Sequence, residues 1–281
     1  MTLVLEGTAP VRSAHRSVRV GNLTPAAGLG LGVATLTLSL IVLLPLAAVL
    51  AEAAAGGWGA FWATITDPQT AAALKLTITE AGLVTIVNVV MGTTIAWVLT
   101  RERFPGIAVV DVLIDVPFAL PTIVTGLVLL SLYGPNSPIG VDIANTRMAV
   151  FTAFLFVTLP FVVRTVQPVL EELDPEVEEA AASLGAGRVT VFRRVILPAL
   201  LPAVTSGAAL SFARAISEYG ALVLLSGNLP MKTEATSVRI LTYIEGDDRA
   251  AAASVATILL AISLLVIVLL DVVQRRVARR G

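Results

Sequence analysis

The sequence predicts an all-α membrane protein with six transmembrane helices, and three observations lead to this fold class. Hydrophobic residues make up 56% of the 281 residues and charged residues only 14%, whereas a soluble domain averages about a quarter charged residues. The apolar residues gather in six stretches, each near the roughly 20 residues that a helix needs to cross a bilayer. Arginine is concentrated in alternate loops between these stretches. The predicted spans are 28–50, 74–99, 109–133, 148–166, 200–225 and 251–273.

The first span is interpreted as a retained helix. It is long, and the mostly polar residues 1–25 precede it, which is untypical of a cleaved signal peptide. An Ala-x-Ala sequence ending at Ala53 would suit cleavage, so that alternative stays open. Prolines interrupt two later spans, at Pro117 and Pro121 in the third and at Pro160 in the fourth. Such breaks are tolerated where neighbouring helices satisfy the freed backbone groups.

The arginines predict the orientation in the cell membrane. Basic residues mark cytoplasmic loops, and thirteen arginines fall on one side: Arg12, Arg16, Arg19, Arg101, Arg103, Arg164, Arg188, Arg193, Arg194, Arg275, Arg276, Arg279 and Arg280. The other side holds five basic residues: Lys75, Arg147, Lys232, Arg239 and Arg249. Both termini and the 167–199 loop are therefore expected in the cytoplasm.

This orientation gives the expected organisation of the chain. The predicted parts are a cytoplasmic tail (1–25), a first helix with an extracytoplasmic loop (26–70), a membrane core (71–274) and a basic cytoplasmic tail (275–281).

Several kinds of chemistry are excluded by residue type. The chain has no cysteine, and its one histidine, His15, lies in the predicted N-terminal tail, so thiol or histidine catalysis and Cys/His metal sites are not expected. No G-x-x-x-x-G-K-S/T motif occurs, so the chain lacks a phosphate-binding loop for ATP. Its net charge of −1 gives no general attraction to nucleic acid. We expect no catalytic residue, metal or cofactor on this chain.

A short polar helix is predicted in the 167–199 loop. Asp174 can cap the free amides, Pro175 suits the first turn, and Glu176 favours the positive end of the helix dipole. Gly185 or Gly187 then supplies a stop. About three turns are too short to be stable alone, so this helix is expected to need a partner.

The face of this helix leaves two interpretations. Val177, Ala181 and Leu184 fall on one side, which suits insertion into a groove on another protein. The alternative is a helix at the membrane surface, with Arg193 and Arg194 meeting lipid headgroups.

This loop resembles the EAA loop of ABC importer permeases. The resemblance rests on Glu179-Ala180-Ala181, on Gly185 and on Leu197-Pro198 at the family's spacing, with Val195 where the family usually has isoleucine. It implies a type I ABC importer permease (MetI-like) fold. It also implies a coupling helix, within 170–198, seated in a cleft of a nucleotide-binding ATPase subunit that holds ATP and Mg. The predicted coupling residues are Glu178, Glu179, Ala180, Ala181, Leu184, Gly185 and Arg188.

Three further stretches resemble the sulfate/thiosulfate branch of this family, its T-type permease subunit. They are PFALPT (117–122), PFVVRTVQPVLEEL (160–173) and GNLPMKTE (227–234). The resemblance implies ATP-driven import of sulfate or thiosulfate, a second homologous permease in a heterodimer, and an extracytoplasmic sulfate-binding protein. A molybdate or tungstate permease is the alternative. An ion-coupled secondary transporter is less favoured because the chain has six spans, no second half and few intramembrane carboxylates.

The fifth span carries charges in an apolar stretch. Counting from residue 200 places Arg214 near the middle of the bilayer, where insertion scales assign arginine a cost of about 2.5–3.5 kcal/mol. Ser211, Arg214 and Glu218 lie within about 60° of one another on a helix. Either Arg214 and Glu218 neutralise each other in a helix contact, or Arg214 attracts an anion along a path that Ser211, Ser217 and Glu218 also line.

Other polar residues have weaker interpretations. Thr77, Glu80 and Asn88 share one face of the second span, where hydrogen bonding between helices is favoured over substrate contact. Thr122 and Thr125, beside Pro121, are candidates for the substrate path at a broken helix.

The 226–249 segment is either a solvated connector or a contact for the binding protein. In the second interpretation Lys232 and Arg239 make that contact.

Overall fold

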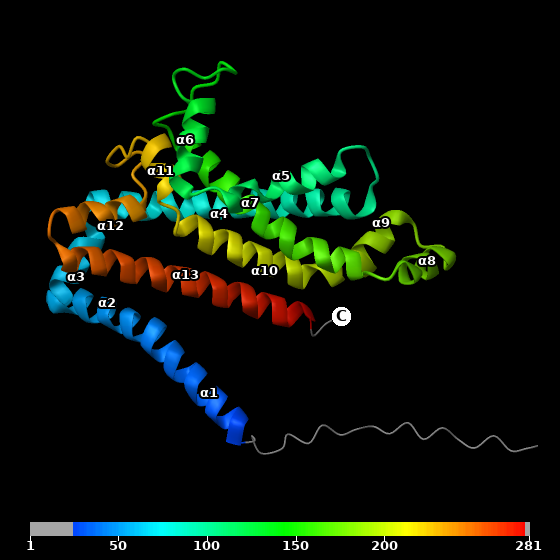
Figure 1. Ribbon diagram of the computed structural model, residues 1–281, viewed down its shortest axis with the longest axis horizontal. Coiled ribbons are helices and arrows are strands. Elements are labelled where there is room, and N and C mark those ends of the chain that lie inside the picture. Colours follow the sequence, from blue (N-terminus) through cyan, green and yellow to red (C-terminus); the bar gives the residue numbers. More distant parts are fainter. Residues whose placement is uncertain (1–24, 279–281) are drawn as a thin grey trace, which may run out of the picture. The chain divides into compact units, whose positions relative to one another are not determined.

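The computed structural model describes residues 25–278, and every regular element within that range is a helix (Figure 1). The chain divides into two compact units, 1–48 and 49–281. The predicted N-terminal tail, with His15, and the last arginines, Arg279 and Arg280, lie outside the described residues.

The first predicted span is helical from Ala26 to Ala55. It consists of α1 (Pro25–Leu38), a π-helical turn η1 (Ser39–Leu43) and α2 (Leu44–Ala55). The wide turn η1 comes just before Pro45, and a second one, η2 (Phe192–Ile196), comes just before Pro198. A proline lacks an amide and its ring clashes with the carbonyl four residues earlier. In both places that carbonyl lies inside the π-helical turn, which explains why the helix widens there.

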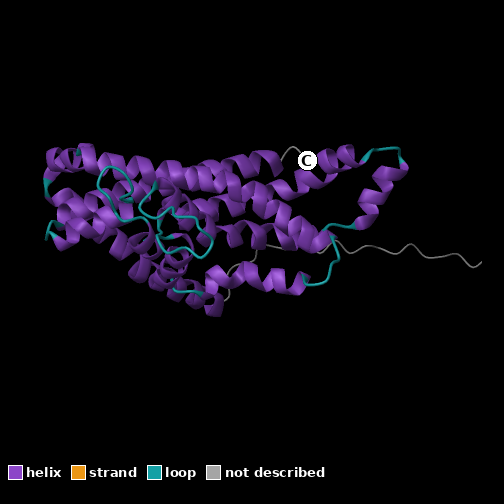
Figure 2. Cartoon of the chain, turned by 90° about the horizontal axis from the view of Figure 1, so that it is seen from above, coloured by secondary structure: helices purple, strands orange, loops and turns teal. Residues whose placement is uncertain are grey.

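Four long helices form the body of the second unit and run alongside one another (Figures 1 and 2). Helix α7 packs against α4 and α10, and α10 also packs against α13. Each contains a segment long and apolar enough to cross a membrane. Their bounds are α4 Pro68–Arg101, α7 Arg147–Glu172, α10 Leu197–Ile216 and α13 Arg249–Ala278.

The third predicted span is not one helix. It forms α5 (Ile107–Ala119) and α6 (Thr122–Tyr133), and the chain bends by 117° between them. Leu120 is extended (φ −86°, ψ 131°), because a residue that precedes proline is disfavoured in the helical region, and Pro121 then starts α6. The described residues therefore contain five candidate spans, or six if the bent pair is counted as one.

The fifth predicted span also ends earlier than expected. Helix α10 stops at Ile216, and residues 220–225 form a separate short helix, α11 (Gly220–Leu225). Arg214 thus lies in the last turn of α10. The prediction of one continuous span was wrong, because the sequence pattern gives no sign of this break, whereas the depth of Arg214 in the bilayer stays a prediction.

Short helices occupy the two ends of the second unit. One end carries α8 (Pro175–Ser183), followed by α9 (Arg188–Val191) and η2. The opposite end carries α3 (Gly57–Thr66) and α12 (Thr236–Glu245). We refer to these as the α8 end and the α12 end.

Glycines allow the long helices to approach closely at Val162 of α7. A Cβ at Gly92 of α4 would lie 2.8 Å from the Val162 Cβ, and one at Gly207 of α10 would lie 3.0 Å from the Val162 Cα. Small residues at such crossings are typical of helices that pack in membranes.

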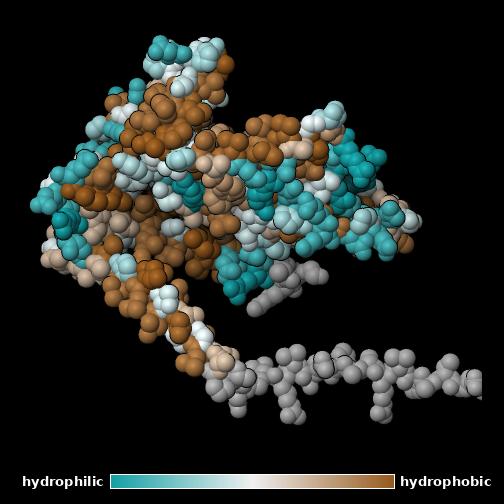
Figure 3. Space-filling model, in the orientation of Figure 1, coloured by the Kyte–Doolittle hydropathy of each residue, from teal (hydrophilic) through white to brown (hydrophobic). Residues whose placement is uncertain are grey.

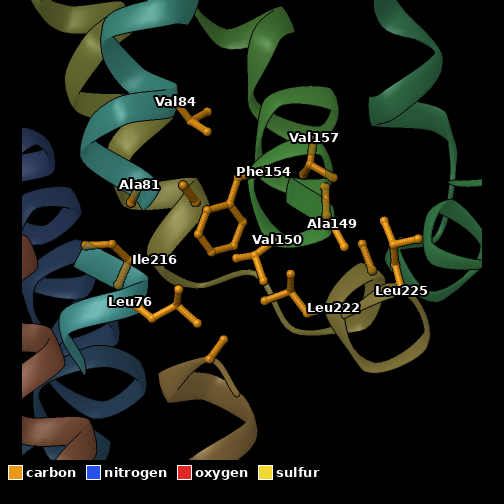
Figure 4. Packing of buried hydrophobic residues seen from close by; sticks show 14 of the residues in the cluster. Leu76, Ala81, Val84, Ala149, Val150, Phe154, Val157, Ile216, Leu222 and Leu225 are labelled. Carbon is orange, nitrogen blue, oxygen red and sulfur yellow. The ribbon is translucent and has the colours of Figure 1, made fainter. Parts of the chain in front are cut away.

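Two apolar clusters fill the unit. In the first, Phe154 of α7 lies among side chains of α4, α10 and α11, including Val84, Ile216 and Leu222 (Figure 4). The second lies nearer the α8 end and contains Val166 and Leu200.

The outer surface is apolar over some elements and polar over others. Hydrophobic areas cover α5 and α6, whereas the surface over α8 and α9 is mostly hydrophilic (Figure 3). Val112 of α5 and Leu127 of α6 are 68% and 55% exposed. Such a surface suits lipid tails or other membrane helices.

Candidate functional site

The predicted loop helix is present as α8. The Asp174 side chain accepts a hydrogen bond from the Glu176 amide at 2.9 Å, and Pro175 opens the helix. Gly185 follows the helix with φ +85°, a left-handed conformation that suits glycine. The predicted start and the stop at Gly185 are confirmed.

One face of α8 has no partner among residues 26–276. Leu184 is 90% exposed and Val177 is 50% exposed. Of the other predicted coupling residues, Glu178 and Ala181 are partly covered, and the rest are exposed: Glu179, Ala180, Gly185 and Arg188. The exposed apolar face fits the expectation that α8 docks on another protein.

Helix α8 is tied to the end of α4. Arg101 Nη2 donates to Glu178 Oε1 at 2.5 Å, and the same guanidinium lies 5.5 Å from the centre of the Trp97 ring. Trp97 in turn meets Phe192 of η2 edge to face, with ring centres 5.9 Å apart. Sequence reasoning missed Trp97 and Phe192, and it treated Arg101 only as an orientation signal.

These contacts border a largely apolar cavity of about 600 Å³ between α4, α8 and the α9–η2 segment. Its wall includes Trp97, Ala182, Val189 and Ile196, with Glu178 and Arg188 as charged members. The cavity separates α8 from the body of the unit. The Arg101–Glu178 pair bridges α8 and α4 beside this cavity.

A second ion-pair cluster joins α5 to α7. Arg164 of α7 holds Asp115 through two bonds of 2.7 Å and donates to Asp111 Oδ1 at 2.6 Å. Such a forked contact fixes geometry as well as charge. Arg164, counted above among the arginines on the cytoplasmic side, thus lies inside α7, near the end of the predicted fourth span. The signal that sequence reasoning missed is the pair Asp111 and Asp115, spaced by four residues in an apolar stretch.

Three helices meet at a buried polar junction around Asn88 of α4. Its Nδ2 donates to Thr158 Oγ1 of α7 at 2.7 Å and to Ser211 Oγ of α10 at 3.2 Å. Thr77 accepts from the amide and the hydroxyl of Thr236 of α12. The predicted hydrogen bonding between helices is confirmed for Thr77 and Asn88. Ser211, a candidate for the substrate path, is fully buried at the junction.

Arg214 and Glu218 form an ion pair, Nη2 to Oε2, at 2.6 Å. The Glu218 side chain is fully buried, and its Oε1 accepts from the Ala221 amide at the start of α11. Ser217 Oγ donates to the Arg214 carbonyl. This geometry matches the interpretation in which the two charges neutralise each other, while 26% of the Arg214 side chain stays exposed.

The other two candidates for the substrate path lie where α6 meets α11. A Cβ at Gly220 would collide with Thr122 Oγ1, and one at Gly126 would lie 2.8 Å from the Ala221 carbonyl oxygen. Thr125 is 1% exposed. Thr122 therefore takes part in tight packing between α6 and α11, and Thr125 is buried in α6 next to Gly126.

The two basic residues predicted to meet a binding protein differ in environment. Arg239 of α12 is only 12% exposed, pairs with Asp67 at 3.3 Å and stacks on Tyr243 at 4.3 Å. The Thr70 amide, which donates to the Asp67 carboxylate, lowers the pKa of Asp67, and Arg239 lowers it further. Lys232 is exposed beside a polar cavity. Binding-protein contact stays a prediction for both.

Residues 88–280 match the family described as binding-protein-dependent transport system inner membrane component. The chain belongs to this family. The matched range includes α8, the α5–α6 pair, the Arg164 cluster and the Arg214–Glu218 pair. The chain is thus an integral membrane transport component, and most of its candidate site lies in the part that defines the family.

Relatives of this transport component are named as sulfate permeases. It is 45% identical over 246 residues to the sulfate transport system permease protein CysT of Salmonella typhimurium, covering 85% of this chain and 89% of that protein. It is 43% identical to the protein of the same name from Synechocystis, covering 83% and 84%. A probable sulfate permease of Chlorokybus atmophyticus is 41% identical, with 83% and 84% covered.

Solved structures of ABC transporters share the fold. A chain of a bacterial alginate ABC transporter, in complex with a periplasmic protein that binds an alginate pentasaccharide, aligns with a TM-score of 0.73 at 17% identity, covering 89% of this chain and 94% of that one. A chain of an amino acid ABC transporter aligns with a TM-score of 0.54 at 22% identity, covering 74% and 94%. The transport component therefore has the type I ABC importer permease (MetI-like) fold predicted above.

Proposed function

We propose that this chain is a permease subunit of an ATP-driven importer that carries sulfate into the cytoplasm. The observation that carries the proposal is the 45% identity with sulfate permeases over 85% of the chain. An exposed α8, where the family's coupling helix is expected, supports an ATP-driven mechanism. Binding and hydrolysis of ATP, with its Mg, are assigned to a nucleotide-binding ATPase subunit.

Helix α8 is the contact for that subunit. Leu184 and Val177 enter a groove on the ATPase, and Gly185 sets the direction in which the chain leaves the helix. A movement of α8 then reaches α4 through Glu178 and Arg101. Because α4 is a continuous helix of 34 residues, a shift at one end is transmitted to the other, as in rigid-helix transitions between two packed states.

The α8 end faces the cytoplasm and the α12 end faces outward. The excess of arginines near α8 and α9 supports this orientation. The outward end then receives sulfate from an extracytoplasmic binding protein, with Lys232 as the exposed contact and Arg239 holding α12 in place.

A second, homologous permease completes the pathway. The exposed apolar side chains of α5 and α6 offer it a surface. Of the predicted path residues, Ser211, Thr125 and Glu218 are buried in contacts between helices. Arg214 keeps part of its guanidinium side chain exposed, so it is the residue of this group best placed to meet an anion.

Co-purification with transport competition tests the proposal. The complex isolated through this chain should contain an ATPase and a second permease, and reconstituted vesicles should take up labelled sulfate. Excess unlabelled sulfate should compete fully, and molybdate weakly. Preferential molybdate uptake, or sulfate uptake without any ATPase in the complex, would overturn the assignment.

A further inference from the structure

A polar cavity of about 260 Å³ lies at the α12 end, apart from α8 and from the Arg214–Glu218 pair. Three separate parts of the chain line it. Helix α4 contributes Ala72, Lys75 and Thr79, Arg147 is the first residue of α7, and Lys232 lies in the loop before α12. We infer that this cavity is a binding site for a tetrahedral oxyanion, the class to which sulfate belongs.

Charge is the first observation behind the inference. Within residues 26–276, neither Lys75, Arg147 nor Lys232 forms an ion pair. The other two basic residues at this end are paired, Arg239 with Asp67 and Arg249 with Asp247. Like charges around one small cavity repel one another, and a bound dianion would offset that repulsion.

Nearby acidic groups do not cancel this charge. Glu234 also lines the cavity, but it is 4% exposed and accepts a hydrogen bond from Gln69 Nε2 at 2.7 Å. Glu80 of α4 interacts electrostatically with Arg147 without forming an ion pair. Three positive side chains therefore face two carboxylates, only one of which lines the cavity.

The helix start at Arg147 is the second observation. A helix N-terminus carries a partial positive charge and favours acidic neighbours, so a basic residue in the first turn is unfavourable there. The same dipole favours a bound anion. An anion in the cavity would thus offset the unfavourable position of the Arg147 charge at this helix start.

The loop that carries Lys232 is held in a fixed conformation. Asn228 and Met231 adopt positive φ angles of 49° and 64°, which non-glycine residues rarely do. The buried Thr233 hydroxyl donates to the Ser226 carbonyl at 2.6 Å, and the Lys232 amide donates to the Leu229 carbonyl at 3.1 Å. Strained backbone of this kind clusters at functional sites, and a fixed loop lowers the entropy lost on binding.

The inference rests on the proposed function for the identity of the anion and for the outward direction of the α12 end. In that setting the cavity is a reception site, where sulfate released by the binding protein is held before it enters the membrane path. Its three cations come from distant parts of the chain, so the site forms only when α4, α7 and the loop before α12 are assembled.

Site-directed labelling tests the cavity directly, because the chain has no cysteine. Ala72→Cys places a thiol in the wall, and Ile139→Cys places one on an exposed control position in another loop. The assembled complex, with its ATPase and second permease, is treated from outside with an anionic or a cationic methanethiosulfonate. Modification is counted on this chain by mass.

The ratio of the modification rate by the anionic reagent to that by the cationic reagent should be about tenfold higher for Ala72→Cys than for the control thiol. This is the effect expected in a cleft lined by one sign of charge. Sodium sulfate should slow its modification more than sodium chloride of equal ionic strength. Both effects should disappear when Lys75→Gln, Arg147→Gln and Lys232→Gln are added. Adding Arg249→Gln, which removes a positive charge outside the cavity, should leave both effects in place.

Either of two outcomes overturns the site: equal labelling by both reagents, or sulfate protection that survives in the triple variant. Sulfate uptake is measured on the same vesicles. If the vesicles take up sulfate but sulfate does not protect the Ala72→Cys thiol, the proposed site is wrong and the proposed function still holds. If sulfate protects the thiol but the vesicles take up no sulfate, the site is supported and the proposed function is wrong.

Discussion

Arg101, at the end of α4, holds Glu178 of α8 in an ion pair of 2.5 Å. A cavity of about 600 Å³ separates α8 from the rest of the unit at this place, so the pair is a direct link between the short helix and a long one. In a coupled transporter, a link of this kind would carry movement of the ATPase into the membrane.

Breaking the pair should uncouple ATP hydrolysis from transport. We expect Arg101→Gln or Glu178→Gln to lower sulfate uptake per ATP hydrolysed, while the free energy of unfolding changes by about 1 kcal/mol or less, since the pair is partly exposed. Sulfate uptake and phosphate release, measured on the same vesicles, give the number of sulfate ions taken up per ATP hydrolysed.

The reversed pair, Arg101→Glu with Glu178→Arg, should recover part of the coupling. Arg275→Gln removes an exposed ion pair with Asp271 and serves as the control. A ratio that stays at the wild-type value in both single variants would exclude the pair from coupling.

Substitution of Gly185 by alanine should weaken ATPase binding more than the same substitution at Gly187. Both positions have open space for a Cβ, but φ is +85° at Gly185 and −68° at Gly187. Alanine at the first position costs roughly 1–2 kcal/mol of left-handed strain, so Gly185→Ala should weaken ATPase binding by about five- to thirtyfold. Gly187→Ala should bind almost normally. Equal binding by both variants would show that the turn does not set the docking geometry.

Close packing of α6 on α11 should depend on Gly126. A Cβ there would lie 2.8 Å from the Ala221 carbonyl oxygen, so Gly126→Ala should lower the melting temperature of the purified complex by several degrees. Gly82→Ala is the matched control, since no atom outside its own helix turn lies within 4 Å. Alanine is a better helix former by about 1 kcal/mol, so this variant should melt at the same or a higher temperature.

Asp67 should make stability depend on pH in the acid range. Its pKa lies below the ordinary value of 3.8, chiefly because the Thr70 amide donates to the carboxylate. A lowered pKa in the folded state means that the carboxylate stabilises the protein above pH 3.8, and that this stabilisation is lost as pH falls through the lower folded value.

Asp67→Asn tests this dependence, because asparagine can still cap α4 but carries no charge. The variant should melt below the wild type at pH 6, and the two melting temperatures should converge in the acid range below the ordinary carboxyl pKa. A constant difference across the range would contradict a role for the charge.

The fold was predictable from the sequence wherever local rules decide it. The cap at Asp174 and the left-handed Gly185 act within one turn, so α8 could be placed within a residue or two. The long apolar runs of α4, α7 and α13 were equally clear. The prolines marked a distortion in the third span, but the 117° bend depends on how α6 packs against α11.

The candidate site was harder to predict, because its contacts join distant parts of the chain. Arg164 reads as a loop arginine until α5 brings Asp111 and Asp115 to it. Ser211 was predicted as a path residue, but in the fold Asn88, 123 positions away, donates a hydrogen bond to its hydroxyl oxygen. The cavity at Lys75, Arg147 and Lys232 likewise forms only in the folded chain.

Labelled sulfate uptake into vesicles that hold the complete complex tests the central claim most directly. Uptake should require hydrolysable ATP on the side that α8 faces, and a non-hydrolysable analogue should support none. Gly185→Trp, which disturbs the docking helix but no membrane span, should abolish uptake while sulfate binding by the separate binding protein is unchanged. Sulfate uptake at the same rate without ATP, or in the Gly185→Trp variant, would contradict the account.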